Sequence, residues 1–191
     1  MSILIVIPAR GGSKRLPRKN KLKIHGKPLF MYSVEAAKNL CMNPRVIVST
    51  DDKEIQNICK ANNIEVLERI KLLALDYSAK QDVIVDVCDE LWEKEFFIPK
   101  VVISLQANSP QITTDILQRS INLFYESKGK NGWKEVICID NDGIQNGSIR
   151  IMTYRSVYQK TLSTYLSTFT KNMVDIHTVN DLKDAEYLLN K

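Results

Sequence analysis

A glycine-containing loop rich in positive charge follows the first apolar segment of the sequence. Residues Ile3–Ile7 are apolar and mostly β-branched, which is typical of a strand buried on both faces. Beyond Pro8, the adjacent Gly11 and Gly12 let the backbone approach an anion closely. Five side chains in the loop can neutralise such an anion: Arg10, Lys14, Arg15, Arg18 and Lys19. A buried strand that leads into a cationic, glycine-rich loop is how α/β proteins bind phosphates, so this stretch predicts a nucleotide-phosphate site.

The loop matches neither of two common phosphate-binding fingerprints. No Gly-Lys-Ser/Thr follows at the spacing of the Walker pattern, and the glycines are adjacent rather than spaced as GxGxxG. A basic surface loop with a glycine turn is therefore the alternative interpretation.

A second pair of residues with metal-binding chemistry lies near the end of the sequence. Asp175 and His177 are two positions apart, so in an extended segment both side chains can reach one ion. A carboxylate suits Mg²⁺, whereas an imidazole suits a softer divalent metal. The alternative is an aspartate that precedes a helix and a partly exposed histidine without a metal.

Alternating strand and helix patterns predict the scaffold that positions these residues, a mostly parallel sheet covered on both faces. The expected strands are Ile3–Ile7, Arg45–Thr50, Ile64–Leu67, Val101–Leu105, Glu135–Ile139 and Ser148–Thr153. The expected helices are Pro28–Leu40, one that begins at Asp51 and Asp52, Gln81–Lys94, Thr114–Tyr125 and Val179–Leu189, the last with Thr178 and Asp181 as a capping box. We expect a loop or irregular segment at Arg69–Lys80 and turns at Ser127–Gly132 and Asn146-Gly147, while Tyr154–Met173 has no clear period.

Three loops of unusual composition are expected at the carboxyl ends of the strands. They are Ala9–Asn20, Gln106–Pro110 and Asp175–Thr178. Ligands of open parallel sheets bind at that edge, so we expect the three loops to form one site.

Bulk properties narrow the class of protein. The 191 residues fit one domain, 1–191, and 44% hydrophobic with 26% charged residues is ordinary for a globular chain. No apolar run has the length of a membrane span, and we expect no signal peptide. The four cysteines are far apart in the sequence, which predicts reduced thiols in a cytoplasmic protein. The net charge of +5 concentrates in the N-terminal loop, which favours a triphosphate ligand over nucleic acid.

The segment IPARGGSKRLPRKN, followed by HGKPLFMYSVEAAK, closely resembles the start of acylneuraminate cytidylyltransferases, the CMP-sialic acid synthetases. The related CMP-3-deoxy-manno-octulosonate synthetases share the architecture. The resemblance implies a three-layer α/β/α sandwich of the nucleotide-diphospho-sugar transferase (glycosyltransferase-A-like) fold. It also implies transfer of CMP from CTP to a sugar acid such as a sialic acid-like nonulosonic acid, with release of pyrophosphate. Mg²⁺, or another divalent cation such as Mn²⁺, would be the cofactor.

The same resemblance implies roles for individual residues. Ala9 and Asn20 would contact the pyrimidine ring, and Arg10 and Lys19 would hold the triphosphate and act in catalysis. The rest of the implied nucleotide-binding set is Gly11, Gly12, Ser13, Lys14 and Arg69. Gln106 would contact the sugar acid, and Asp175 with His177 would bind the metal. The alternatives are a solvated loop arginine at 69 and a glutamine that bonds backbone at 106.

The sequence departs from the family pattern in the loops that would complete catalysis. Asn108 stands where the octulosonate enzymes have a metal-binding aspartate, so it offers only a neutral amide oxygen. His177 replaces the second aspartate of a D-I-D-T motif, and Lys80 stands where the family often has serine or threonine near the pyrimidine. The segment between Ile139 and Asn146 is much shorter than in sialic acid synthetases, where it carries acceptor-binding basic residues and dimer contacts.

These departures leave several interpretations open. A smaller acid, a phosphate or a phosphonate is an alternative acceptor, and a catalytically silent nucleotide-binding relative is an alternative function. CTP and a sugar acid are the expected partners, with a homodimer implied only by resemblance.

Overall fold

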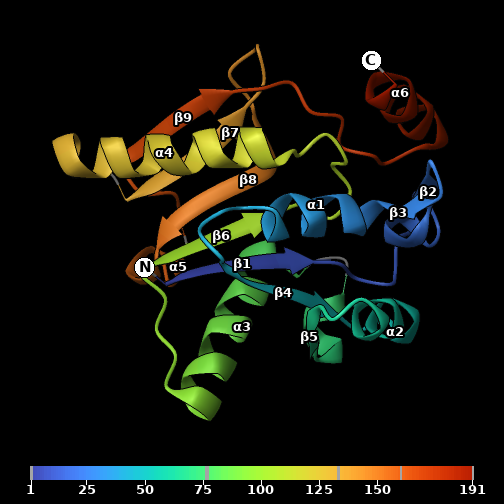
Figure 1. Cartoon of the computed structure of the whole chain (residues 1–191), viewed down its shortest axis with the longest axis horizontal. Helices are drawn as coiled ribbons and strands as arrows, with labels where there is room; N and C mark the ends of the chain where they lie inside the picture. The colour runs from blue at the N-terminus through green and yellow to red at the C-terminus, as the bar shows by residue number, and fades with distance from the viewer. Residues whose placement is uncertain (1, 76–77, 133, 160, 191) are drawn as a thin grey trace.

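A seven-stranded sheet forms the centre of the protein (Figure 1). The structure is a computed structural model that describes residues 2–75, 78–132, 134–159 and 161–190. The strands lie in the order β5-β4-β1-β6-β8-β7-β9, and within this sheet only β8 runs against its neighbours. Their bounds are β1 Ile3–Pro8, β4 Arg45–Thr50, β5 Glu65–Glu68, β6 Val101–Leu105, β7 Glu135–Ile139, β8 Gln145–Thr153 and β9 Leu166–Thr170. The predicted mostly parallel sheet is confirmed.

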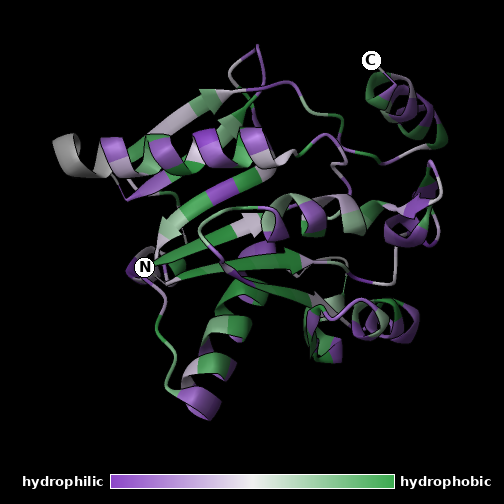
Figure 2. Cartoon of the chain, viewed as in Figure 1, coloured by the Kyte–Doolittle hydropathy of each residue, from purple (hydrophilic) through white to green (hydrophobic). Residues whose placement is uncertain are grey.

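Helices cover both faces of the sheet because its central strands are apolar on both sides. In β1, Ile3 and Ile5 belong to the core on one face, while Leu4 and Val6 belong to the core on the other. Figure 2 shows these central strands as hydrophobic and much of the flanking helices as hydrophilic. The first face is covered by α1 (Leu29–Lys38), α2 (Lys53–Ala61) and α4 (Thr114–Asn131), and the second by α3 (Lys80–Glu95) and α5 (Tyr154–Val157). The predicted three-layer α/β/α sandwich is therefore confirmed.

The C-terminal helix α6 (Val179–Leu189) is joined to the loop after β1 by a small apolar cluster. That cluster also includes the hairpin formed by β2 (Lys23–Ile24) and β3 (Lys27–Pro28). Its buried members are Leu16, Ile24, Leu29, Ile176 and Ala185. The predicted capping box is confirmed, because Thr178 and Asp181 each accept a hydrogen bond from the backbone N–H of the other. The segment before α6 is thus held next to the cationic loop.

Two predicted turns are wrong. Helix α4 continues to Asn131 instead of ending before a turn at Ser127–Gly132, since one interior glycine costs a helix only about 1 kcal/mol. Asn146 and Gly147 lie inside β8, and the chain reverses earlier, where Asp140 Oδ1 accepts from the backbone N–H groups of Asp142 and Ile144.

The two segments that the sequence left without regular structure contain short elements. The segment Arg69–Lys80 contains a 3₁₀ turn at Lys71–Ala74, and residues 76 and 77 lie outside the described residues. The segment Tyr154–Met173 contains α5 and the edge strand β9, with residue 160 also outside. Within the described ranges, no helix has the length and apolarity needed to cross a membrane.

Candidate active site

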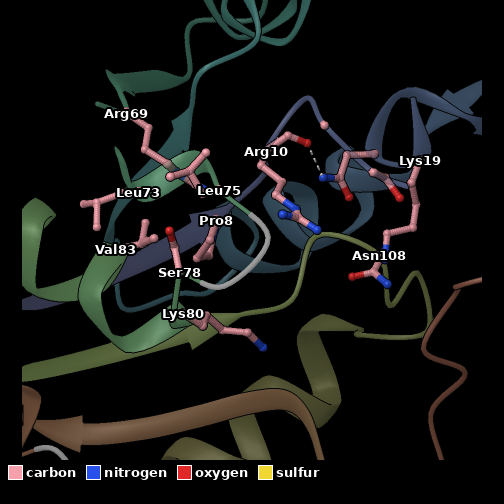
Figure 3. Close-up of a pocket in the computed structure, with 13 residues that line it drawn as sticks. Pro8, Arg10, Lys19, Arg69, Leu73, Leu75, Ser78, Lys80, Val83 and Asn108 are labelled. Atoms are coloured by element: carbon pink, nitrogen blue, oxygen red, sulfur yellow. Dashed lines mark hydrogen bonds between the residues drawn. The ribbon is translucent and has the colours of Figure 1, made fainter. Parts of the chain in front are cut away.

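A pocket of about 210 Å³ opens at the carboxyl edge of the parallel strands (Figure 3). The loop after β1, the segment after β5, the first turn of α3 and the loop after β6 contribute its walls. Figure 3 shows the aliphatic side chains of Leu73, Leu75 and Val83 gathered on one side of this view, with Lys19 and Asn108 on the other. The complete lining is Pro8, Arg10, Gly12, Ser13, Lys19, Asn20, Arg69, Leu73, Leu75, Ser78, Lys80, Val83 and Asn108.

A second, cationic cleft of about 400 Å³ adjoins this pocket. The two share Arg10, Ser13 and Lys19, and the cleft adds Lys14, Arg15 and His177. Residues of all three loops that were expected to meet therefore line this continuous region. Four cations in the cleft, next to a partly apolar pocket, favour a ligand with an aromatic group at one end and several negative charges at the other.

Gly11 shapes the cationic loop by fitting against the start of α2. Its backbone N–H donates to Asp51 Oδ1 at 2.9 Å, and a Cβ at position 11 would lie 2.7 Å from Asp52 Oδ2. Asp52 is itself fixed, because it caps α2 through the N–H groups of Glu54 and Ile55 and pairs with Lys21 at 2.7 Å. Gly11 therefore packs against Asp52, and its N–H is bonded to Asp51 in this structure, whereas the sequence predicted that this backbone would contact a phosphate. Carboxylates directly after a strand were the sequence signal for this support.

Asn20 offers a hydrogen-bond acceptor at the pocket wall. Its Nδ2 donates to the backbone oxygen of Arg10 at 2.9 Å, while the buried Oδ1 has no partner among the described residues. Ala9, by contrast, is fully buried behind the pocket with its N–H donating to the Ser49 oxygen. The structure therefore brings Asn20 to the pocket and leaves Ala9 in the core.

Arg69 is buried, so its interpretation as a solvated loop arginine is wrong. Only 5% of the residue is exposed, and Nη2 donates to the Ser49 backbone oxygen at 2.7 Å while Nε donates to Ser49 Oγ at 3.3 Å. Burial lowers the pKa of Arg69 to about 10; Asp51 opposes this shift and Arg10 adds to it. The group remains charged at neutral pH and presents a fixed cation to the pocket.

Two lysines on opposite sides of the pocket have lowered pKa values. Burial lowers the pKa of Lys19, partly offset by Asp175, and the neighbouring Arg10 lowers it further. Desolvation by the surrounding protein likewise lowers the pKa of Lys80, whose Nζ donates to the Gly147 backbone oxygen at 3.0 Å. For both lysines desolvation is the main cause of the lowered pKa; Asp175 opposes it, and neighbouring cations add to it.

Asn108, Asp175 and His177 form one hydrogen-bonded group. Asn108 Nδ2 donates to Asp175 Oδ1 and, at 2.9 Å, to the backbone oxygen of Ile176. His177 Nε2 lies 2.9 Å from Asp175 Oδ2, so both carboxylate oxygens are engaged. The amide of Asn108 thus holds Asp175 with its nitrogen, and Asp175 and His177 face each other rather than a common point. Among the residues that the structure describes, no group of three or more His, Cys, Asp or Glu side chains forms a metal site.

Gln106 lies at the end of β6, beside the pocket rather than in its lining. Its backbone is fixed by Ser148 and by Ser33, whose Oγ donates to the Gln106 oxygen at 2.7 Å. The side-chain Oε1 is buried and has no partner in the described chain. It lies near Gly147 and Lys80, where a Cβ on Gly147 would meet both side chains at 3.4 Å.

Comparison with known proteins identifies the family. The family described as Cytidylyltransferase matches residues 4–188 of this chain. The chain belongs to the cytidylyltransferase family. The resemblance seen in its first twenty residues thus extends over nearly the whole sequence.

Individual relatives agree with this assignment. The pseudaminic acid cytidylyltransferase of Campylobacter jejuni is 36% identical over 131 residues, which are 68% of this chain and 56% of that protein. The 3-deoxy-manno-octulosonate cytidylyltransferase of Wigglesworthia glossinidia brevipalpis is 31% identical over 69% of this chain and 49% of its own length. The chain therefore spans about half the length of the curated relatives that it matches.

The fold of the family is also found in solved structures. A CMP:2-keto-3-deoxy-manno-octonic acid synthetase complexed with CTP aligns with a TM-score of 0.77 at 18% identity, covering 100% of this chain and 99% of the other. At that identity the likeness shows the fold, and it confirms the nucleotidyltransferase architecture expected from the sequence.

Among the described residues beside the cationic cleft, Asp175 is the ligand that suits a divalent cation of the kind implied by the family. Mg²⁺ is commonly bound through one or two carboxylates together with substrate phosphates and water. Asp175 has 32% of its side chain exposed beside the cationic cleft, so it fits as the single carboxylate. His177 does not suit Mg²⁺, which prefers oxygen ligands, and Asn108 directs its nitrogen toward Asp175.

Proposed function

We propose that this cytidylyltransferase-family protein binds CTP and transfers CMP to a sugar acid, releasing pyrophosphate. The observation that carries the proposal is the continuous region formed by the partly apolar pocket and the cationic cleft, which share Arg10, Ser13 and Lys19. Its position at the carboxyl edge of the sheet is the usual ligand site of open α/β proteins.

The proposed pose places the cytidine in the pocket and the triphosphate in the cleft. Leu73, Leu75 and Val83 offer apolar surface to the base, and Asn20 Oδ1 offers an acceptor to its exocyclic amino group. Arg69 is a rigid cation on the same wall. Such a pairing of apolar walls with a few fixed polar atoms is typical of small-molecule sites.

The reaction requires the hydroxyl oxygen of the acceptor to attack the α-phosphorus and give up its proton to solvent, while the bond from the α-phosphorus to the α–β bridging oxygen breaks and pyrophosphate leaves. Arg10, Lys14 and Lys19 would hold the phosphates and neutralise the charge that develops on the leaving pyrophosphate. A divalent cation, Mg²⁺ or Mn²⁺, held by Asp175 and the phosphates would supply further neutralisation. The main contribution of the protein is therefore positioning and electrostatic stabilisation.

A sialic acid-like nonulosonic acid is the acceptor that we propose first. The names of the relatives indicate pseudaminic acid and 3-deoxy-manno-octulosonate as acceptors of those proteins, so a sugar acid is the class that they share. A smaller acid, a phosphate or a phosphonate is the alternative, because the connection between β7 and β8 is only a tight turn. Gln106, beside the pocket, is the proposed contact to the acceptor.

A second candidate function is nucleotide binding without turnover. It is supported by the hydrogen bonds of Asn108 and His177 to both oxygens of Asp175, which compete with metal binding. We further propose that the chain acts as one domain in the cytoplasm, without nucleic acid or membrane partners, and as a homodimer.

Pyrophosphate release tests the proposal directly. The protein is incubated with CTP, Mg²⁺ or Mn²⁺ and a panel of sugar acids, small acids, phosphates and phosphonates. Turnover with a sugar acid is the expected result, and a Lys19→Met variant should lose most of it. CTP binding by calorimetry without pyrophosphate release from any acceptor would instead establish the silent relative.

A further inference from the structure

A small pocket of about 140 Å³ lies on the α3 face of the sheet, next to the proposed nucleotide pocket. Lys80 lines both pockets. Gln81 and Ile84 of α3 form one wall of the smaller pocket, and Ser104 of β6 lies opposite them. Strand β8 contributes Gln145, Gly147 and Arg150. We call it the Lys80–Arg150 pocket.

The register of the sheet creates this pocket. Ser104 and Arg150 are directly paired between β6 and β8. Their neighbours on the same side of each strand, Val102 and Met152, belong to the core beneath α3, so Ser104 and Arg150 point to that face. A hydroxyl and a guanidinium thus replace apolar side chains where the α3 core reaches the carboxyl edge of the sheet.

Arg150 is locked in place by two hydrogen bonds. Nη2 donates to Glu135 Oε1 and Nη1 donates to Gln81 Oε1, each at 2.6 Å. Glu135 is fully buried, and its other oxygen accepts from the Ser163 N–H. Arg150 is therefore a fixed cation, and its Nε has no partner among the described residues.

Unpaired polar atoms surround the pocket. Ser104 is 2% exposed, yet its Oγ has no hydrogen-bond partner in the described part of the chain, and the same holds for the nearby Gln106 Oε1. Buried polar atoms normally find partners, so such a cluster indicates a missing ligand or water. Lys80 adds positive charge, and the residues that line the pocket include no carboxylate.

The geometry points to an anion site: we propose that the Lys80–Arg150 pocket binds the carboxylate of the acceptor sugar acid. This inference rests on the proposed cytidylyl transfer. Lys80 would donate directly to the carboxylate, exchanging its bond to the Gly147 oxygen, while Arg150 would act as the fixed charge behind it. Because Lys80 borders the nucleotide pocket, a carboxylate held there lies beside the bound CTP.

The pocket would then determine acceptor specificity through residues other than those of the shortened β7–β8 connection. A neutral sugar would not offer Lys80 a charged partner in exchange for its bond to the Gly147 oxygen, which selects against it. The basic residues that the acceptor requires are thus supplied by the body of the sheet and by α3.

Equilibrium binding and kinetics of matched variants test this assignment. Lys80→Met removes the charge but keeps a long side chain, and Ser104→Ala removes a hydroxyl that has no internal partner to lose. Lys100→Met, just before the start of β6 at the opposite edge, is the control. Binding of N-acetylneuraminate, 3-deoxy-manno-octulosonate and their carboxamides is measured by calorimetry with protein saturated with CMP.

We expect the wild-type protein to bind at least one of the acids at least about tenfold more tightly than its carboxamide, as for one charge-assisted hydrogen bond. Lys80→Met should abolish this preference, Ser104→Ala should reduce it about threefold, and Lys100→Met should leave it unchanged. Where turnover is seen, Lys80→Met should raise KM for the acid by a clearly larger factor than KM for CTP, although Lys80 also borders the nucleotide pocket.

Equal binding of acid and carboxamide, or absence of binding by every acid, would overturn the assignment whatever the turnover result. An equal rise of both KM values in Lys80→Met would instead place Lys80 at the nucleotide. Failure of cytidylyl transfer itself appears separately, as absence of pyrophosphate release from a protein that still discriminates acid from carboxamide.

Discussion

Substitution of Gly11 by alanine should destabilise the protein although the residue lies in a surface loop. The added Cβ would lie 2.7 Å from Asp52 Oδ2 and 2.8 Å from Asp52 Cβ, well inside the 3.4 Å at which ordinary van der Waals contact begins. Because the near atoms include Cβ, a rotation of the carboxylate cannot relieve the overlap. The loop and the start of α2 must move apart.

That movement disturbs a set of connected contacts. Asp52 caps α2, pairs with Lys21 and stands beside Asp51, which accepts from the Gly11 N–H. Loss of an N-cap costs about 1 kcal/mol and overpacking about 1–3 kcal/mol, so we expect a loss of about 2 kcal/mol. For a chain of this size that corresponds to a fall in Tm of about 4–8 °C.

The adjacent glycine supplies a matched control. A Cβ at Gly12 would meet no atom within 4 Å, so Gly12→Ala should keep the wild-type Tm to within about 1 °C. Thermal unfolding followed by circular dichroism measures both variants. Equal Tm values for Gly11→Ala and the wild type, or equal losses in the two variants, would refute the packing role assigned to Gly11.

Three further predictions follow from the same contacts. Arg69→Met should lower the free energy of unfolding by about 1–3 kcal/mol, because it removes the charge-assisted hydrogen bonds of the buried guanidinium to the backbone oxygen and the Oγ of Ser49, and should weaken CTP binding in calorimetry; the exposed Arg155→Met should do neither. Thr178→Ala should lower Tm by about 2–4 °C and Thr178→Ser should restore it, whereas equal stability of all three forms would contradict the capping role. Burial alone would raise the pKa of Asp52, but Lys21 and the N–H groups of the helix outweigh burial and lower this pKa. The Asp52 charge therefore stabilises the fold above about pH 4, and this stabilisation is lost as the pH falls through the pKa that Asp52 has in the folded protein. Asp52→Asn keeps a good N-cap, so its deficit in unfolding free energy by urea titration should be present at pH 7 and shrink below about pH 4; a constant deficit would be inconsistent with that shift.

Most strands and helices could be predicted because their signals are local, whereas the edge strand β9 was not. The strands at Arg45–Thr50, Val101–Leu105 and Glu135–Ile139 have the predicted bounds, since burial on both faces leaves runs of mostly apolar residues. Helix Val179–Leu189 has the predicted bounds because its capping box marks the start. The position of the turn before β8 was missed because Asn146-Gly147 is a strong local turn signal. Side-chain hydrogen bonds of Asp140 determine the actual reversal.

For the site, residue types and their order along the chain predicted a phosphate-binding loop and the meeting of three loops at one edge. Both follow from composition and from the parallel direction of the strands, which the sequence alone determines.

Only the tertiary structure decided how the individual side chains are used. Asn108 meets Asp175, which lies 67 positions further along the chain, and Arg150 reaches Gln81 at a sequence separation of 69. Contacts at such separations depend on strand order, on register and on the path of the chain after β9, none of which has a local signature. If the register of β8 against β6 were shifted by one position, Ser104 and Arg150 would no longer be paired on one face of the sheet, and the Lys80–Arg150 pocket would not form.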